Sequence, residues 1–141
     1  MVFKLLRQGK EEAKKLNKRD DLNRAALIAM AAVYSDGEAG EKEVLSAENI
    51  IHSMFDGIFR RDEVTEALSL AEAAYAGGLV SARLKTRRAC EGVESPTEAE
   101  ALFAVGADVC ASEGDIGEKE DKWLRTWLAP NLKVKAENLL G

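Results

Sequence analysis

The nine residues SDGEAGEKE (35–43) return as SEGDIGEKE (112–120), 77 residues further along a chain of 141. Six of the nine positions are identical, and two more exchange aspartate for glutamate. Both copies are acidic, and two glycines interrupt each of them. The repetition predicts two related halves, each built from a helix, an acidic turn and a second helix. If the halves pack about a pseudo-twofold axis, the two turns occupy related positions.

The composition favours helix over the whole chain. It is 46% hydrophobic and 32% charged with only two prolines, and β-branched runs are missing. The length fits one domain. Apolar residues recur at helical spacing, which predicts an all-α fold of about seven helices in two pseudo-symmetric halves. The expected helices cover about 20–34, 41–56, 64–76, 79–88 and 96–110, then a sixth around 123–128 and a short seventh that ends at 140.

Start and stop signals mark several of these helices. Ser95 is a natural N-cap, Pro96 suits the first helical position, and Glu98 can complete a capping box. We expect Pro130 to end the sixth helix, because proline breaks the helical hydrogen-bond pattern, and Asn131 to cap the seventh.

A basic arm precedes an acidic body. Residues 1–19 contain seven Lys or Arg and two Glu, whereas the whole chain carries a net charge of −5. We therefore divide the chain into the arm (1–19) and one helical domain (20–141), with halves at about 20–78 and 79–141. Apolar residues of the arm can fasten it to the body as a solvated first helix; alternatively, the arm makes peripheral contact with a membrane or a partner. No basic stripe extends beyond the arm, so nucleic acid is not an expected partner.

The location expected from the sequence is the cytoplasm, with the membrane periphery as the alternative for the arm. No apolar stretch reaches the 18 or so residues of a membrane span, and the start lacks a signal-peptide pattern. Cys90 and Cys110 match no disulfide framework and no metal-binding spacing. We expect both to be reduced thiols, with Cys110 in the core.

Half of the acidic residues in the turns have a local explanation and half do not. Glutamates at 41, 43, 118 and 120 fall in the first turn of a helix, where the helix dipole stabilises negative charge. Asp36 and Glu113 follow the C-terminal end of a helix, where the dipole disfavours negative charge. Glu38 and Asp115 add further repulsion. A bound cation would remove this repulsion, whereas a solvated acidic connector between two helices is the alternative.

An EF-hand does not fit, since a twelve-residue loop started at Asp36 or Glu113 lacks glycine at position six and glutamate at position twelve. A hard divalent ion takes about six or more oxygen ligands, more than one short turn supplies. We therefore predict one site shared by both turns. Its leading ligands are Asp36, Glu43, Glu113 and Glu120, with Glu38 and Asp115 in support. The ion expected is Ca²⁺, with Mg²⁺ or Mn²⁺ as alternatives.

No catalytic constellation is visible, so we predict that the chain is not an enzyme. His52 is the only histidine and lies beside the apolar face of its helix. No serine or cysteine has a recognisable base partner, and the glycines form no phosphate-binding motif.

The segments AAVYSDGEAGEKEVL and ADVCASEGDIGEKEDKWL resemble the duplicated signatures of TerB-like tellurite-resistance proteins. The resemblance covers nearly the whole chain, including the lysine-rich start and the terminal LAPNL. It implies an all-α fold of two pseudo-symmetric halves, an acidic surface that binds divalent metal, and a role in bacterial tellurite resistance and stress response. It also implies partners, namely TerD-like proteins and a TerC-like membrane protein. Glu113 stands where the family usually has aspartate, and Gly40 and Gly117 replace its usual capping Ser or Asp.

Two hypotheses about function follow. In the first, the chain is a non-enzymatic, metal-responsive interaction module whose acidic turns bind a divalent cation. In the second, it is a structural scaffold domain whose acidic face binds a basic partner without metal.

Overall fold

The computed structural model describes residues 12–37, 39–112 and 114–141, and over these residues it contains helices and no β-strand. The first helices are α2 (Arg19–Val33), α3 (Glu41–Met54), α4 (Arg61–Gly77), α5 (Leu79–Glu91) and α6 (Pro96–Cys110). A continuous rod follows, made of α7 (Glu118–Trp123), η1 (Leu124–Leu128) and α8 (Ala129–Leu132), and α9 (Ala136–Leu140) ends the chain. With the rod counted once, the described residues from Arg19 onward form seven helices. The predicted all-α class and helix number are confirmed.

The repeat seen in the sequence has the same register in the structure. The helices α2 and α6 each have 15 residues, and α6 begins and ends 77 positions after α2. The helices α3 and α7 also begin 77 positions apart, and each has an extended glycine as its N-cap, Gly40 or Gly117. The repeated unit is therefore α2–turn–α3 and α6–turn–α7, and α4 and α5 lie between the two copies along the chain.

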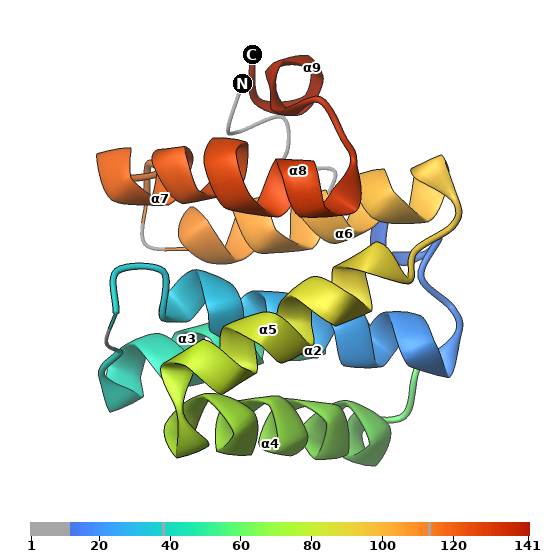
Figure 1. The fold of residues 1–141 in the computed structure, drawn as a ribbon. Helices are drawn as coiled ribbons and strands as arrows, with labels where there is room; N and C mark the ends of the chain where they lie inside the picture. The colour runs from blue at the N-terminus through green and yellow to red at the C-terminus, as the bar shows by residue number, and fades with distance from the viewer. Residues whose placement is uncertain (1–11, 38, 113) are drawn as a thin grey trace.

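The two copies meet through their first helices, because α2 and α6 pack side by side at the centre of the molecule (Figure 1). They run in the same direction. At their N-terminal ends Lys18 Nζ lies 3.4 Å from Glu98 Oε1, and their C-terminal ends face the same pocket, described below. Helices α3 and α4 cover α2 on one side, and the α7–η1–α8 rod covers α6 on the other (Figure 1). Helix α5 crosses in front of α2.

Close packing at the centre depends on Gly106 of α6. A Cβ atom at this position would lie 2.6 Å from Leu128 Cδ2 and 3.2 Å from Ile28 Cγ2. Both neighbours are fully buried, so neither can move away into solvent. Glycine at 106 therefore lets η1 and α2 approach α6 closely.

From Ala101 onward, helix α6 is buried on all sides rather than on one face. Apolar residues at helical spacing are typical of a helix with one buried face, but every residue from Ala101 to Cys110 is buried. The reason is position: α6 lies between α2 and the rod and also contacts α3, so no side of its C-terminal half reaches solvent. Asp108 is buried with these residues. Burying a polar carboxyl costs free energy that an aspartate at the surface does not cost.

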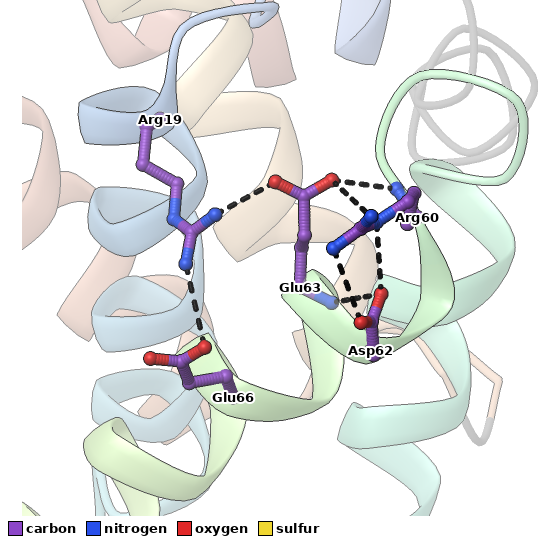
Figure 2. Close-up of polar contacts among 5 residues, drawn as sticks. All are labelled: Arg19, Arg60, Asp62, Glu63 and Glu66. Carbon is purple, nitrogen blue, oxygen red and sulfur yellow. Dashed lines mark hydrogen bonds and ion pairs between the residues drawn. The ribbon is translucent and has the colours of Figure 1, made fainter.

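Ion pairs fix the start of α2 to the start of α4 (Figure 2). Arg19 Nη1 lies 2.7 Å from Glu63 Oε2, and Arg19 Nη2 lies 3.5 Å from Glu66 Oε2. The other oxygen of Glu63 accepts the backbone N–H of Arg60 at 3.1 Å, which is the usual bond of an N3 glutamate to its N-cap residue. Arg60 and Asp62 pair beside it at 3.2 Å. One glutamate thus caps α4 and joins α4 to α2.

The predicted N-cap of α6 is confirmed, and the predicted stop at Pro130 is wrong. Ser95 Oγ accepts the backbone N–H of Glu98 at 3.4 Å, with Pro96 at the first helical position. The Glu98 carboxylate pairs with Lys18 across the α2–α6 interface.

The rod continues through Pro130 to Leu132, because the π-helical η1 precedes the proline. In η1 the Ala129 N–H bonds to the carbonyl of Leu124, five residues back, and the wider turn accommodates a residue that has no N–H. Asn131 does not cap α9; its side-chain amide donates to the Trp127 carbonyl at 2.8 Å. The helix ends at Lys133, which has a left-handed backbone (φ 59°).

The described part of the basic arm packs on the body. Ala13 and Leu16 are fully buried in the core, as the interpretation of a fastened first helix requires. The rest of the arm, residues 1–11, lies outside the described residues, so its predicted membrane or partner contact stays a prediction. None of the helices in the described ranges combines the length and the apolar character that crossing a membrane requires.

Candidate functional site: an acidic pocket between the two turns

The two acidic turns line one pocket of about 490 Å³ at the C-terminal ends of α2 and α6. Much of its lining comes in pairs of residues that are 77 positions apart. The pairs are Ala32 and Val109, Val33 and Cys110, Ser35 and Ser112, and Glu43 and Glu120. The pocket is thus built from equivalent positions of the two copies, as the parallel arrangement of α2 and α6 dictates.

Glycine allows each turn to reverse direction beside the pocket. Gly37 has φ of 105° and Gly114 has φ of 130°, which are left-handed conformations that other residues rarely adopt. They occupy equivalent places after α2 and α6. Both turns therefore depend on glycine at this place.

Glu43 and Glu120 enter the pocket from the first turn of α3 and α7. Each is the third residue of its helix. Glu120 Oε1 accepts the backbone N–H of Gly117 at 3.1 Å, so the start of α7 holds this carboxylate in place. The helix dipole at these N-termini stabilises negative charge on both side chains.

The carboxylates of the pocket are close enough to influence one another. Burial raises the pKa of Glu120 above its ordinary value, and the negative charges of Asp36 and Glu43 raise it further. The Gly117 N–H and the Cys110 thiol act in the opposite direction. Asp36 belongs to the first turn and Glu43 to α3, whereas Glu120 belongs to α7, so this interaction joins the two copies.

Four of the six predicted ligands lie at this pocket. Asp36, Glu43, Asp115 and Glu120 all line it. Glu38 and Glu113 lie outside the described residues, so their part in the site stays a prediction. Among the residues that are described, no three His, Cys, Asp or Glu side chains converge closely enough to hold an ion. The donors face a common pocket without forming a closed coordination shell.

Three further lining residues carry titratable groups that the sequence reasoning did not place at the site. Glu118 adds a fifth carboxylate, and Lys119 is the one lysine among the residues that line the pocket. Cys110 was expected in the core; it is buried, but it also lines the pocket and faces the Glu120 carboxylate. Its place could have been inferred from the register, since it lies 77 positions after Val33, at the end of a helix that leads into the turn.

The imidazole and thiol groups of the chain belong to His52, Cys90 and Cys110. His52 is not among the lining residues and contacts Thr65 Oγ1 at 3.3 Å; burial and then the charge of Arg61 lower its pKa. Burial raises the pKa of Cys90 to about 12 and also raises that of Cys110, so both remain neutral thiols at neutral pH. What the pocket offers is negative charge and oxygen donors.

No protein-family model, curated protein or solved structure matches this chain.

Proposed function

We propose that the chain is a non-enzymatic interaction module whose acidic pocket binds a divalent cation. The observation that carries this proposal is the position of the two turns, which lie 77 residues apart in sequence and line one pocket. Five carboxylates face that pocket, from Asp36, Glu43, Asp115, Glu118 and Glu120. A cation bound among them would offset their mutual repulsion.

The donor set fits a hard cation. Carboxylates and the hydroxyls of Ser35 and Ser112 are oxygen ligands of the kind that Ca²⁺, Mg²⁺ and Mn²⁺ take. Ca²⁺ is the leading candidate, because it accepts six to eight oxygens in irregular geometry, whereas Mg²⁺ demands a near-ideal octahedron. Glu38 and Glu113, which lie outside the described residues, belong to the hypothesis through their places in the two acidic turns of the sequence.

The same resemblance supports the wider role that we propose, in a bacterial tellurite-resistance and stress-response system. Cation occupancy would then change the charge and rigidity of the surface offered to a partner, with TerD-like proteins and a TerC-like membrane protein as the candidates. The proposed location is the cytoplasm, with peripheral membrane contact through residues 1–19.

The alternative function is a metal-independent scaffold whose acidic face binds a basic partner. The observation in its favour is that no three potential ligands in the described ranges already converge on one point. In this case the five carboxylates would pair with lysine or arginine side chains of the partner.

Calorimetric titration of the full chain with Ca²⁺, Mg²⁺ and Mn²⁺ separates the two functions. A shared site predicts one equivalent of cation, at least tenfold weaker binding in Glu43→Gln and in Glu120→Gln, and little further loss in the double variant. Glu100→Gln is the matched control, because Glu100 is an exposed glutamate outside the pocket lining. Binding should also raise the melting temperature, since a cation at a hundred times its Kd adds about 2.7 kcal/mol to the free energy of unfolding.

The tryptophans of the rod give an optical signal for the same experiment. Trp123 and Trp127 stack with ring centroids 5.6 Å apart, and Trp123 ends the helix that carries Glu120. If cation binding tightens the second turn, their fluorescence should change with the same midpoint as the calorimetric titration. If none of the three ions produces heat or shifts the melting temperature, cation binding is rejected and the scaffold function remains.

A further inference from the structure

Exposed apolar side chains gather on the hairpin of α4 and α5. Among the described residues four large hydrophobic side chains are exposed: Leu45 (58%), Leu70 (62%), Val80 (83%) and Leu84 (45%). Three of the four belong to these two consecutive helices, which pack against each other. Val80 and Leu84 are four residues apart and therefore lie next to each other on one side of α5.

Helix α5 is basic, although the chain as a whole is acidic. Helix α5 contains four basic residues and one acidic residue, a net charge of +3, whereas the whole chain carries −5. Two of the basic side chains already have partners: Arg83 donates to the Tyr34 carbonyl at 3.2 Å, and Arg87 pairs with Glu91 at 3.0 Å.

Two positive charges remain beside the apolar pair. Lys85 and Arg88 are exposed, and neither lies within ion-pair distance of a carboxylate in the described ranges of the chain. Together with Val80 and Leu84 they form what we call the α5 face. It combines uncovered apolar surface with uncompensated positive charge, on a helix about 20 Å long.

We propose that the α5 face binds an acidic amphipathic helix of a partner protein. Leucine side chains of that helix would cover Val80 and Leu84, and its carboxylates would pair with Lys85 and Arg88. Charge complementarity selects this occupant over an anionic membrane. An extended anionic surface would meet the net negative charge of the whole chain, whereas a single helix interacts mainly within a Debye length of about 8 Å. Two apolar side chains also offer less than the broad apolar face that membrane binding uses.

The test is a fluorescence-anisotropy titration of the full chain against a labelled synthetic peptide, in EDTA so that the result is independent of the acidic pocket. The peptide is a 16-residue capped helix with leucine along one face and glutamate on its flanks. Two control peptides replace glutamate by lysine or leucine by alanine. We expect saturable binding of the acidic peptide, at least tenfold weaker binding of both control peptides, and weakening as salt rises.

Protein variants locate the surface. Lys85→Glu combined with Arg88→Glu, and Val80→Ala combined with Leu84→Ala, should each weaken binding at least tenfold. All four side chains are exposed, so these changes should leave the fold intact, which circular dichroism checks. Leu45→Ala is the matched control, because it removes an exposed leucine from α3 and should leave binding unchanged.

Several outcomes would overturn the proposal. One is the absence of saturable binding, and another is equal affinity for the lysine peptide. Insensitivity to the α5 variants would place the peptide elsewhere. The protein could instead sediment with phosphatidylserine vesicles and bind no peptide. If only the α5 variants abolish this sedimentation, the α5 face is a membrane-binding surface. Concentration-dependent dimers that the same variants abolish would make a second copy of this chain the occupant.

Discussion

Asp108 places an ionisable carboxyl inside the molecule, so replacing it with asparagine should change how stability depends on pH. The side chain is 5% exposed, and its Oδ1 atom is buried without a hydrogen-bond partner. Burial raises the pKa of Asp108 from 3.8 to about 7. The folded state therefore holds a proton that the unfolded chain releases, and the stability that this proton contributes is complete below pH 3.8 and is lost as pH rises to about 7.

The size of the effect follows from the shift in pKa. One pKa unit corresponds to about 1.4 kcal/mol, so the free energy of unfolding loses of the order of 4 kcal/mol over the full range. Between pH 5 and pH 8 the loss is about 3 kcal/mol. The Asp108→Asn variant does not ionise, so its free energy of unfolding relative to the unmodified protein should rise by about that amount over the same interval.

Urea unfolding at pH 5, 6, 7 and 8, followed by circular dichroism, measures this difference. Asp56→Asn is the matched control, since Asp56 is exposed at the turn after α3 and its replacement should give a pH profile parallel to that of the unmodified protein. If Asp108→Asn also runs parallel to the unmodified protein, within about 0.5 kcal/mol, Asp108 is ionised without penalty in the folded state, and the reasoning from its burial is wrong.

Three further substitutions test the packing by urea unfolding. Gly106→Ala should lower the free energy of unfolding by about 1–3 kcal/mol, because its Cβ would meet Leu128 at 2.6 Å; a neutral result would mean that α6 can shift away from η1. Leu16→Ala should cost about 2–5 kcal/mol, because this residue of the basic arm is fully buried; an unchanged midpoint would show that the arm is dispensable. Tyr75→Phe should cost about 1 kcal/mol, because it removes the buried 2.7 Å hydrogen bond to Thr86; Thr86 keeps its bond to the Ala82 carbonyl, so a much larger loss would contradict a simple hydrogen-bond deletion.

Local signals in the sequence were sufficient for the class of fold and for the turns. Helical spacing, the N-cap at Ser95 and the two glycines that need left-handed backbones each depend on a few neighbouring residues, so they can be read without knowing the rest of the structure. The duplication added one long-range statement, that the two acidic turns occupy related positions. Asp36 and Glu43 from one copy, with Asp115 and Glu120 from the other, do line one pocket.

The tertiary structure decided what depends on contacts between distant segments. Asp108 of α6 would be expected at the surface from its residue type, but neighbouring helices on several sides bury it, and this burial raises its pKa. Pro130 predicts the end of a helix, but the π-helical turn before it allows the rod to continue. Val80 and Leu84 read as ordinary apolar positions of a helix, and only the direction in which α5 packs leaves them in solvent. Composition and spacing specify what each segment can form, whereas burial and exposure are properties of the assembled fold, because they depend on which other segments cover a side chain.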